Sequence, residues 1–219
     1  FSSRRRHTRS LVPSRGLGDV YKRQEYPQVC LDEISKTLRS TPRGSLPLEP
    51  GKPLREDHEY KRHGQCALFL AIEPLQGFRR VWVSDRRTKL DFAQVLKELV
   101  DEVYPDAKKI VLVVDNLNIH HPACLYERFP PAEARRIAAK IEWHYTPEHA
   151  SWLNIAECEL SVLRRQCLKS RISDIQTVAE KAIAWQNQRN EQQVGVDWRF
   201  TTEDARIKLK RLYPIVKVQ

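Results

Sequence analysis

The sequence contains no apolar run close to the roughly 18 residues that a membrane-spanning helix needs, so we expect no membrane segment. Its five cysteines include no CxxC pair, which argues against a zinc site. Their odd number fits no disulfide framework and favours a reducing, cytoplasmic compartment. Residues 25–219 also lack internal repeats and low-complexity segments. These absences leave one domain of ordinary size as the expected organisation.

Positive charge is abundant but unevenly distributed, with a net charge of +10 at pH 7. Residues 1–24 hold seven Lys and Arg and one acid, and they supply six of these ten charges. Residues 14–24 look like the translation of a sequencing-library adapter, so we interpret residues 1–24 as a non-native leader without a fold. A natural basic arm for nucleic acid is the alternative. The remaining +4 is compatible with DNA binding but does not argue for it.

Hydrophobic patterning over residues 25–219 predicts a mixed α/β domain with a central sheet. The expected strands cover residues 29–31, 66–72, 80–84, 110–114 and 141–144. The expected helices cover residues 91–103, 132–140, 153–168 and 177–189. A last helix should be capped by Thr201 or Thr202 and stop near Pro214. Residues 42–64, rich in Pro, Gly and charge, should form a long loop or flap.

Three acidic residues stand in settings that suit metal binding. Asp32 follows the first expected strand, Asp115 ends the apolar run 110–114, and Glu157 lies at the start of a helical pattern. Hard divalent cations prefer oxygen ligands. Two such ions, about 4 Å apart, activate a nucleophile and stabilise a leaving oxygen in one in-line displacement at phosphorus.

The residues alone leave an alternative open at each acid. Asp115 also suits a turn or a helix cap. Asp32 and Glu33 alternate along a strand, so only one of them faces the same side as Asp115. Glu157 and Glu159 border the apolar face of their helix, each about 80° from its centre, and helical geometry does not choose between them.

Polar residues near these acids are further candidates. Asn116, Asn118 and His120 follow Asp115 at the carboxyl end of a strand, where ligands gather in α/β sheets. They could hold waters or a phosphate oxygen, or merely bond within the loop. Trp152 could stack on a displaced base, although core packing is the more ordinary role for such a residue. The basic residues that could track phosphates, or form a solvated face, are Arg79, Arg80, Arg86, Arg87 and Lys89.

Several motifs together resemble bacterial insertion-sequence transposases of the mariner-related DDE superfamily, nearest to the insertion sequence six-thirty family. They are Asp115-Asn116-x-x-x-His120, then Tyr145-Thr146-Pro147-x-His149-Ala150-Ser151-Trp152-Leu153-Asn154-x-x-Glu157. Cys30-Leu31-Asp32-Glu33 is similar to the first catalytic strand of that family. Trp185-x-x-x-Arg189-Asn190 and residues 200–206 are similar to the tail of close relatives. The resemblance covers residues 25–219, and the order of its motifs is specific.

This resemblance implies an RNase H-like domain over residues 25–219, with a mixed central sheet flanked by helices. It implies that Asp32, Asp115 and Glu157 form a catalytic triad that binds two Mg²⁺ (or Mn²⁺) ions. The neighbours expected to position the site or contact DNA are Asn116, Asn118, His120, Trp152 and Asn154. The expected partners are transposon ends and target DNA, bound by a homodimer in the bacterial cytoplasm at the nucleoid. Without metal, clustered carboxylates should have raised pKa values.

Two departures qualify the expected activity. The interval from Asp115 to Glu157 is longer than in mariner proper, and the family's amino-terminal helix-turn-helix region is not present. We therefore expect a fragment that starts just before its first catalytic strand. The alternatives are a nuclease on the same fold, or an inactive DNA-binding or assembly remnant.

Overall fold

The computed structural model describes residues 25–43, 45–46, 50–51, 55–56 and 58–210. The predicted leader, residues 1–24, and the predicted helix stop at Pro214 lie outside these residues. No helix in the described part of the chain is long and apolar enough to cross a membrane.

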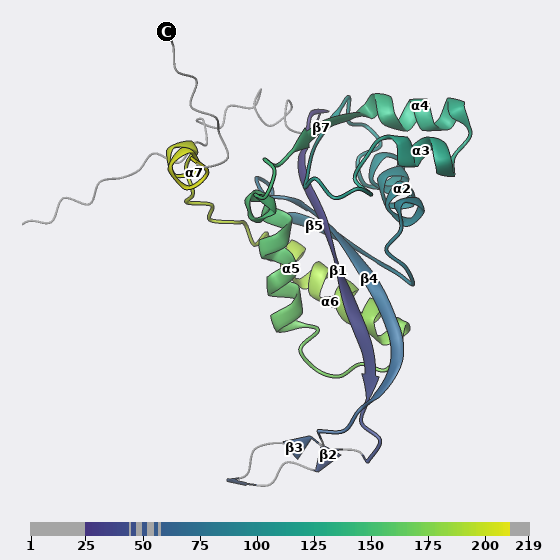
Figure 1. The fold of residues 1–219 in the computed structure, drawn as a ribbon, viewed down its shortest axis with the longest axis vertical. Helices are drawn as coiled ribbons and strands as arrows, with labels where there is room; N and C mark the ends of the chain where they lie inside the picture. The colour runs from purple at the N-terminus through teal and green to yellow at the C-terminus, as the bar shows by residue number, and fades with distance from the viewer. Residues whose placement is uncertain (1–24, 44, 47–49, 52–54, 57, 211–219) are drawn as a thin grey trace, which may run out of the picture.

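A five-stranded mixed sheet in the order β5-β4-β1-β6-β7 forms the centre of the protein (Figure 1). The strands are β1 (Gln28–Ser40), β4 (Lys61–Glu73), β5 (Phe78–Ser84), β6 (Ile110–Val114) and β7 (Ile141–Tyr145). The first three pair antiparallel, whereas β6 runs parallel to β1 and β7 runs parallel to β6. This arrangement confirms the predicted RNase H-like mixed sheet.

β1 is far longer than the predicted strand 29–31, because it pairs with β4 from Cys30 to Ser40. The two strands form a ribbon that extends beyond the helical layers (Figure 1). The second half of β1 carries charged side chains, so hydrophobic patterning did not reveal this part of the strand. The predicted loop 42–64 is therefore wrong at its end, where β4 begins at Lys61. Within that segment β2 (Ser45–Leu46) pairs with β3 (Arg55–Glu56).

The helices largely match the predicted segments. They are α2 (Lys89–Glu98), α4 (Pro131–Lys140), α5 (Ile155–Gln166), α6 (Ile175–Glu191) and α7 (Thr202–Lys208). A π-helical turn, Leu99–Val103, extends α2 over the rest of its predicted length. A short helix, α3 (Ala123–Arg128), was not predicted.

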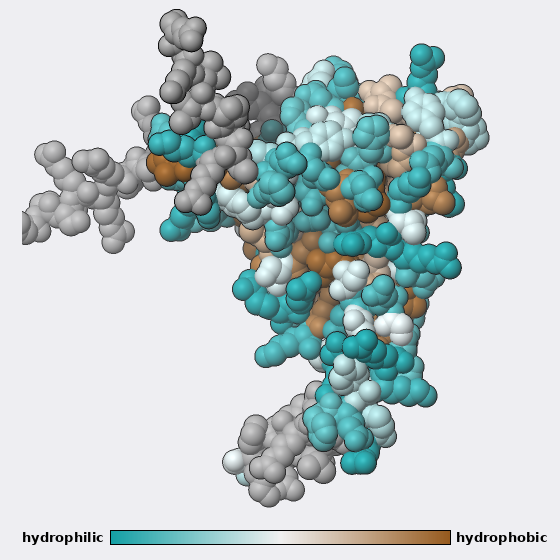
Figure 2. Space-filling model, in the orientation of Figure 1, coloured by the Kyte–Doolittle hydropathy of each residue, from teal (hydrophilic) through white to brown (hydrophobic). Residues whose placement is uncertain are grey.

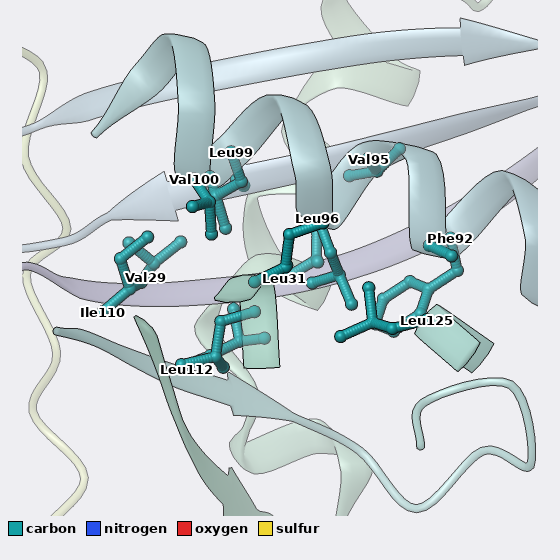
Figure 3. Packing of buried hydrophobic residues seen from close by; sticks show 14 of the residues in the cluster. Val29, Leu31, Phe92, Val95, Leu96, Leu99, Val100, Ile110, Leu112 and Leu125 are labelled. Atoms are coloured by element: carbon teal, nitrogen blue, oxygen red, sulfur yellow. The ribbon is translucent and has the colours of Figure 1, made fainter. Parts of the chain in front are cut away.

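Helices cover both faces of the sheet and enclose two hydrophobic cores. On one face, Val29 and Leu31 of β1 pack with Phe92 and Leu96 of α2 (Figure 3). On the other face, Cys30 of β1 packs in the core that contains the buried residues of α5 and α6. Strand alternation therefore sends Asp32 toward the α5 face and Glu33 toward the α2 face.

Candidate active site

Asp32 lies on β1, and Asp115 directly follows the neighbouring parallel strand β6. Cys30 of β1 is the partner of Val113 of β6, and two further residues along each strand bring Asp32 level with Asp115. Val113 packs in the α5-side core, so alternation sends Asp115 to the face that Asp32 occupies. The structure thus brings together two of the predicted catalytic carboxylates.

The environment of Asp32 disfavours its ionised form. Burial, together with the charges of Glu33 and Asp115, raises the pKa of Asp32 to about 7, against the opposing effect of its hydrogen bond from a backbone amide. That bond joins the Glu33 amide to Oδ1 of Asp32 at 2.8 Å. The expected rise in carboxylate pKa is therefore present at Asp32.

His120 joins Asp115 to Glu33 from beneath the site. Its side chain has no exposed surface, with Nδ1 2.7 Å from Oδ1 of Asp115 and Nε2 2.8 Å from Oε2 of Glu33. Contacts from both ring nitrogens to carboxylate oxygens favour the form in which both nitrogens donate, which is the imidazolium. Burial lowers the pKa of His120, but the bonds to Asp115 and Glu33 outweigh it and raise the pKa to about 9. The ring of Phe92 packs against it, with centroids 4.6 Å apart.

The expected rise in pKa is wrong for Asp115. The hydrogen bond from His120 lowers its pKa, and the bond from the Leu117 amide acts in the same direction against burial. Both bonds end on Oδ1, at 2.7 and 3.0 Å. No hydrogen bond from a described residue reaches Oδ2, which leaves that oxygen available to a ligand.

The sequence offered Glu33 only as the alternative to Asp32 and did not reveal its bond to His120. The carboxylate of Glu33 is buried on the α2 face, bonded to His120 and 3.7 Å from Nη1 of Arg87. Both acids are therefore linked to Asp115, in different ways. Asp32 shares a face of the sheet with Asp115, whereas Glu33 is connected to Asp115 through His120. The sequence signal was the adjacency of two acids at one strand position, which alternation assigns to opposite faces.

Asn154 fixes the start of α5 against β1. Its buried side chain donates to the carbonyl of Leu31 at 2.9 Å and accepts from the amide of Ala156 as the N-cap. The first turn of α5 is thereby held one residue away from Asp32. Since Asn154 has no exposed surface, it positions the helix and is not available to contact DNA.

Glu157 and Glu159 differ sharply in environment. Glu159 is buried, and its Oε1 lies 2.9 Å from Nε of Arg79 and 2.8 Å from Nε of Arg189. Glu157 is exposed in the first turn of α5, on the face of the sheet that Asp32 occupies. The buried ion pairs commit Glu159 to structure, so Glu157 is the accessible carboxylate of this helix.

The other predicted neighbours divide between loop, core and surface. Asn116 donates from Nδ2 to the carbonyl of Thr146 at 2.5 Å, which ties the loop after β6 to the end of β7, and Asn118 is exposed. Trp152 meets Phe200 edge-on at a centroid distance of 4.9 Å and lies under Nζ of Lys208. The structure therefore places Trp152 in packing with the α7 segment.

The predicted phosphate contact of Arg79 is wrong. Its guanidinium is fully buried, and a strand-flanking position could not reveal that Glu159 lies opposite. Of the other basic residues suggested for this role, Arg86 and Arg87 are exposed, and Lys89 pairs with Glu127 at 2.5 Å.

The acidic side chains supply only part of a divalent-cation site. Among the described residues, no group of three or more His, Cys, Asp or Glu side chains is close enough to hold a metal ion. Two carboxylates do stand side by side, and repulsion between them contributes to the raised pKa of Asp32. A cation would relieve that repulsion, and oxygen donors are the ligands that Mg²⁺ and Mn²⁺ prefer. The pair therefore fits one side of a cation site, and Glu157 is an exposed carboxylate of α5 on the same face of the sheet.

Comparison with known families agrees with this geometry. A model described as "DDE superfamily endonuclease" matches residues 27–179. The chain belongs to this family. The match spans β1 to the beginning of α6 and contains Asp32, Asp115 and Glu157. Members of the DDE superfamily use divalent metals. A search among curated proteins found no significant match to the sequence.

Solved structures of similar shape include complexes of the Mos1 transposase. The Mos1 mariner paired end complex with Mn has a TM-score of 0.49 at 15% identity, over 81% of this chain and 54% of that one. The Mos1 strand transfer complex has a TM-score of 0.37 at 13% identity, over 84% and 59%. The chain therefore spans a little over half the length of these proteins.

Proposed function

We propose that this DDE family member is the catalytic core of a DNA transposase, cutting phosphodiester bonds at the ends of an insertion-sequence element and joining them to target DNA. The observation that carries the proposal is the level placement of Asp32 and Asp115 on one face of the sheet, beside the start of α5. The family match supports the nuclease chemistry. Two finer parts of the proposal rest on the motif resemblance: that the element is a bacterial insertion sequence, and that the transposase acts as a homodimer.

In this proposal Asp32, Asp115 and Glu157 hold two Mg²⁺ or Mn²⁺ ions. Ions bound there supply the Lewis acidity that activates a water or a DNA 3′-hydroxyl and stabilises the leaving 3′-oxygen. His120 would fix the Asp115 carboxylate through Oδ1, which leaves Oδ2 to bind an ion. Asn154 holds the first turn of α5, and with it Glu157, beside β1.

The proposal predicts that Asp115→Ala abolishes DNA cleavage in the presence of Mn²⁺ or Mg²⁺, because the ion loses a ligand that no other described residue replaces. The measurement is cleavage of a labelled duplex that carries an element end. The control is Glu203→Gln, which removes one exposed carboxylate on α7. Cleavage by the Asp115→Ala protein would refute the assignment.

Two outcomes separate the proposal from its alternatives. A nuclease on the same fold would cut DNA but would not join it, so strand transfer with pre-cut ends distinguishes the two activities. An inactive remnant would bind DNA with a steep salt dependence and be indifferent to Asp115→Ala.

A further inference from the structure

An unusual cluster of arginines lies toward the end of the β1–β4 ribbon that is remote from the acidic site. The guanidinium carbons of Arg39, Arg171 and Arg62 lie 4.5, 5.7 and 5.8 Å from the centre of the Tyr60 ring. We call these four residues the arginine cluster. Tyr60 and Arg62 are exposed, whereas Arg39 and Arg171 are partly buried.

Strand pairing forces two of these positive charges together. Arg39 of β1 is the cross-strand partner of Arg62 of β4. Like charges directly opposite each other destabilise a sheet. The adjacent pair places Ser40 opposite Lys61, which adds another cation beside them. Such crowding costs stability unless an anion shares the site.

Backbone contacts hold the third arginine in place. Lys36 donates from Nζ to the carbonyls of Leu168 and Ser170, and the amide of Arg39 donates to the carbonyl of Ile172 at 2.6 Å. Arg171 in turn donates from Nη1 to the carbonyl of Glu59 at 3.0 Å. The segment after α5 is thus pinned to β1, which preorganises the cluster.

The described residues around the cluster are almost all of one sign. Residues 36–43, 58–63 and 169–171 hold seven Lys and Arg but a single acid, Glu59. That acid lies 3.7 Å from Arg43, which is itself largely exposed. The hydrogen bond from Arg62 and the surrounding arginines lower the pKa of Tyr60, as expected in a positive field. Figure 2 shows this end of the ribbon as a hydrophilic surface.

We propose that the arginine cluster binds the phosphate backbone of duplex DNA at a distance from the cleavage site. Arg39 lies seven residues beyond Asp32 on β1, which corresponds to at most about 23 Å of strand, or roughly seven base pairs of duplex. Arginine forks match phosphate oxygens, and Tyr60 keeps the guanidinium planes in a fixed orientation. A duplex bound at the acidic site would have to extend along the ribbon by about this length to reach the cluster. The inference rests on the proposed function.

The test is the salt dependence of DNA binding, measured by fluorescence anisotropy in EDTA with a labelled duplex of about 30 base pairs, long enough to span both sites. Arg39→Ala/Arg62→Ala should reduce the slope of log affinity against log salt by about two, because two phosphate contacts are lost. Arg39→Lys/Arg62→Lys should retain most of the slope, since the charges remain. The matched control is Arg128→Ala/Arg135→Ala, which removes two exposed arginines near α3 and α4.

Equal slopes for the two alanine variants would overturn the proposal. So would a cluster variant that loses self-association in sedimentation but keeps its full DNA slope, which would assign the surface to a second copy of the chain. Removing a repelling pair should not lower the melting temperature. Should the alanine variant unfold, Arg39→Gln/Arg62→Gln removes the same two charges with longer polar side chains and should show the same loss of slope. Binding in EDTA requires no cleavage, so absence of nuclease activity would refute the proposed function while leaving this result intact.

Discussion

His120 is the residue on which the geometry of Asp115 depends. It is buried between two carboxylates, and its removal leaves Glu33 buried without its hydrogen-bonded cation. We predict that His120→Ala lowers the free energy of unfolding by about 3 kcal/mol, the cost of breaking a buried ion pair on one side. Urea unfolding measures this. The control is His144→Ala, whose exposed ring pairs with exposed Glu142 and should change stability by less than about 0.5 kcal/mol.

A His120→Ala protein as stable as the wild type would show that the bridge contributes nothing to folding. The expected loss is independent of metal, so it should be the same in EDTA. A loss that appeared only with Mn²⁺ present would contradict the structural role of the ring.

At the level of single residues, the sequence identified Asp32, Asp115 and His120 as neighbours but not the way they connect. The strand ends predicted two carboxylates at one edge, which the register of β1 and β6 supports. The bond between His120 and Glu33 spans 87 positions of sequence. No local pattern encodes such a contact, because it depends on how α2 and the loop after β6 pack against the sheet.

Helix α5 carries two glutamates whose substitution should change the free energy of unfolding by very different amounts. We predict that Glu159→Gln lowers the free energy of unfolding by about 3 kcal/mol, because Arg79 then remains buried without its ion pair. Glu157→Gln should leave stability in EDTA within about 0.5 kcal/mol, as an exposed substitution does. Chemical unfolding of both variants measures the difference. Equal losses of stability would contradict a structural role for Glu159 and an exposed, non-structural position for Glu157.

The contact between the end of α2 and α4 should depend on pH. Asp101 in the π-helical turn accepts from both terminal nitrogens of Arg136, at 2.7 and 2.9 Å, and these bonds, with Lys97, lower its pKa. A carboxylate with a lowered pKa stabilises the fold above its unfolded pKa of about 3.9, and that contribution is lost as the pH falls through the folded value. Asp101→Asn should therefore destabilise more at pH 7 than at pH 3, by less than about 1 kcal/mol for this partly exposed group. Thermal unfolding at the two pH values checks it.

Helices and strands marked by a local sequence pattern were predicted well. Strand segments that exist only because they pair with a distant strand were not predicted. Pro131 at the first position of α4 and the alternating burial of β6 are local features. The start of α2 was placed late because the capping box of Thr88 and Asp91 begins the helix at Lys89. The charged half of β1 carries no apolar pattern, and only its pairing with β4 makes it a strand.

On the scale of the whole molecule, the sheet separates two tasks. One face buries Glu33 and His120 against α2, which supports Asp115 from behind. The other face bears Asp32 and Asp115 beside α5, where a ligand has access. The β1–β4 ribbon extends beyond the helical layers (Figure 1), and in our proposal its arginine cluster contacts a duplex bound at the acidic site.

The most direct test of a shared cation site is the change in melting temperature that Mn²⁺ or Mg²⁺ produces. A ligand that binds only the folded state at a hundred times its dissociation constant stabilises it by about 2.7 kcal/mol, so we predict a rise of several degrees. Asp115→Ala and Glu157→Gln should reduce or abolish this rise, while Glu203→Gln should retain it. A wild-type protein indifferent to both ions, or an Asp115→Ala protein with an undiminished rise, would contradict the account.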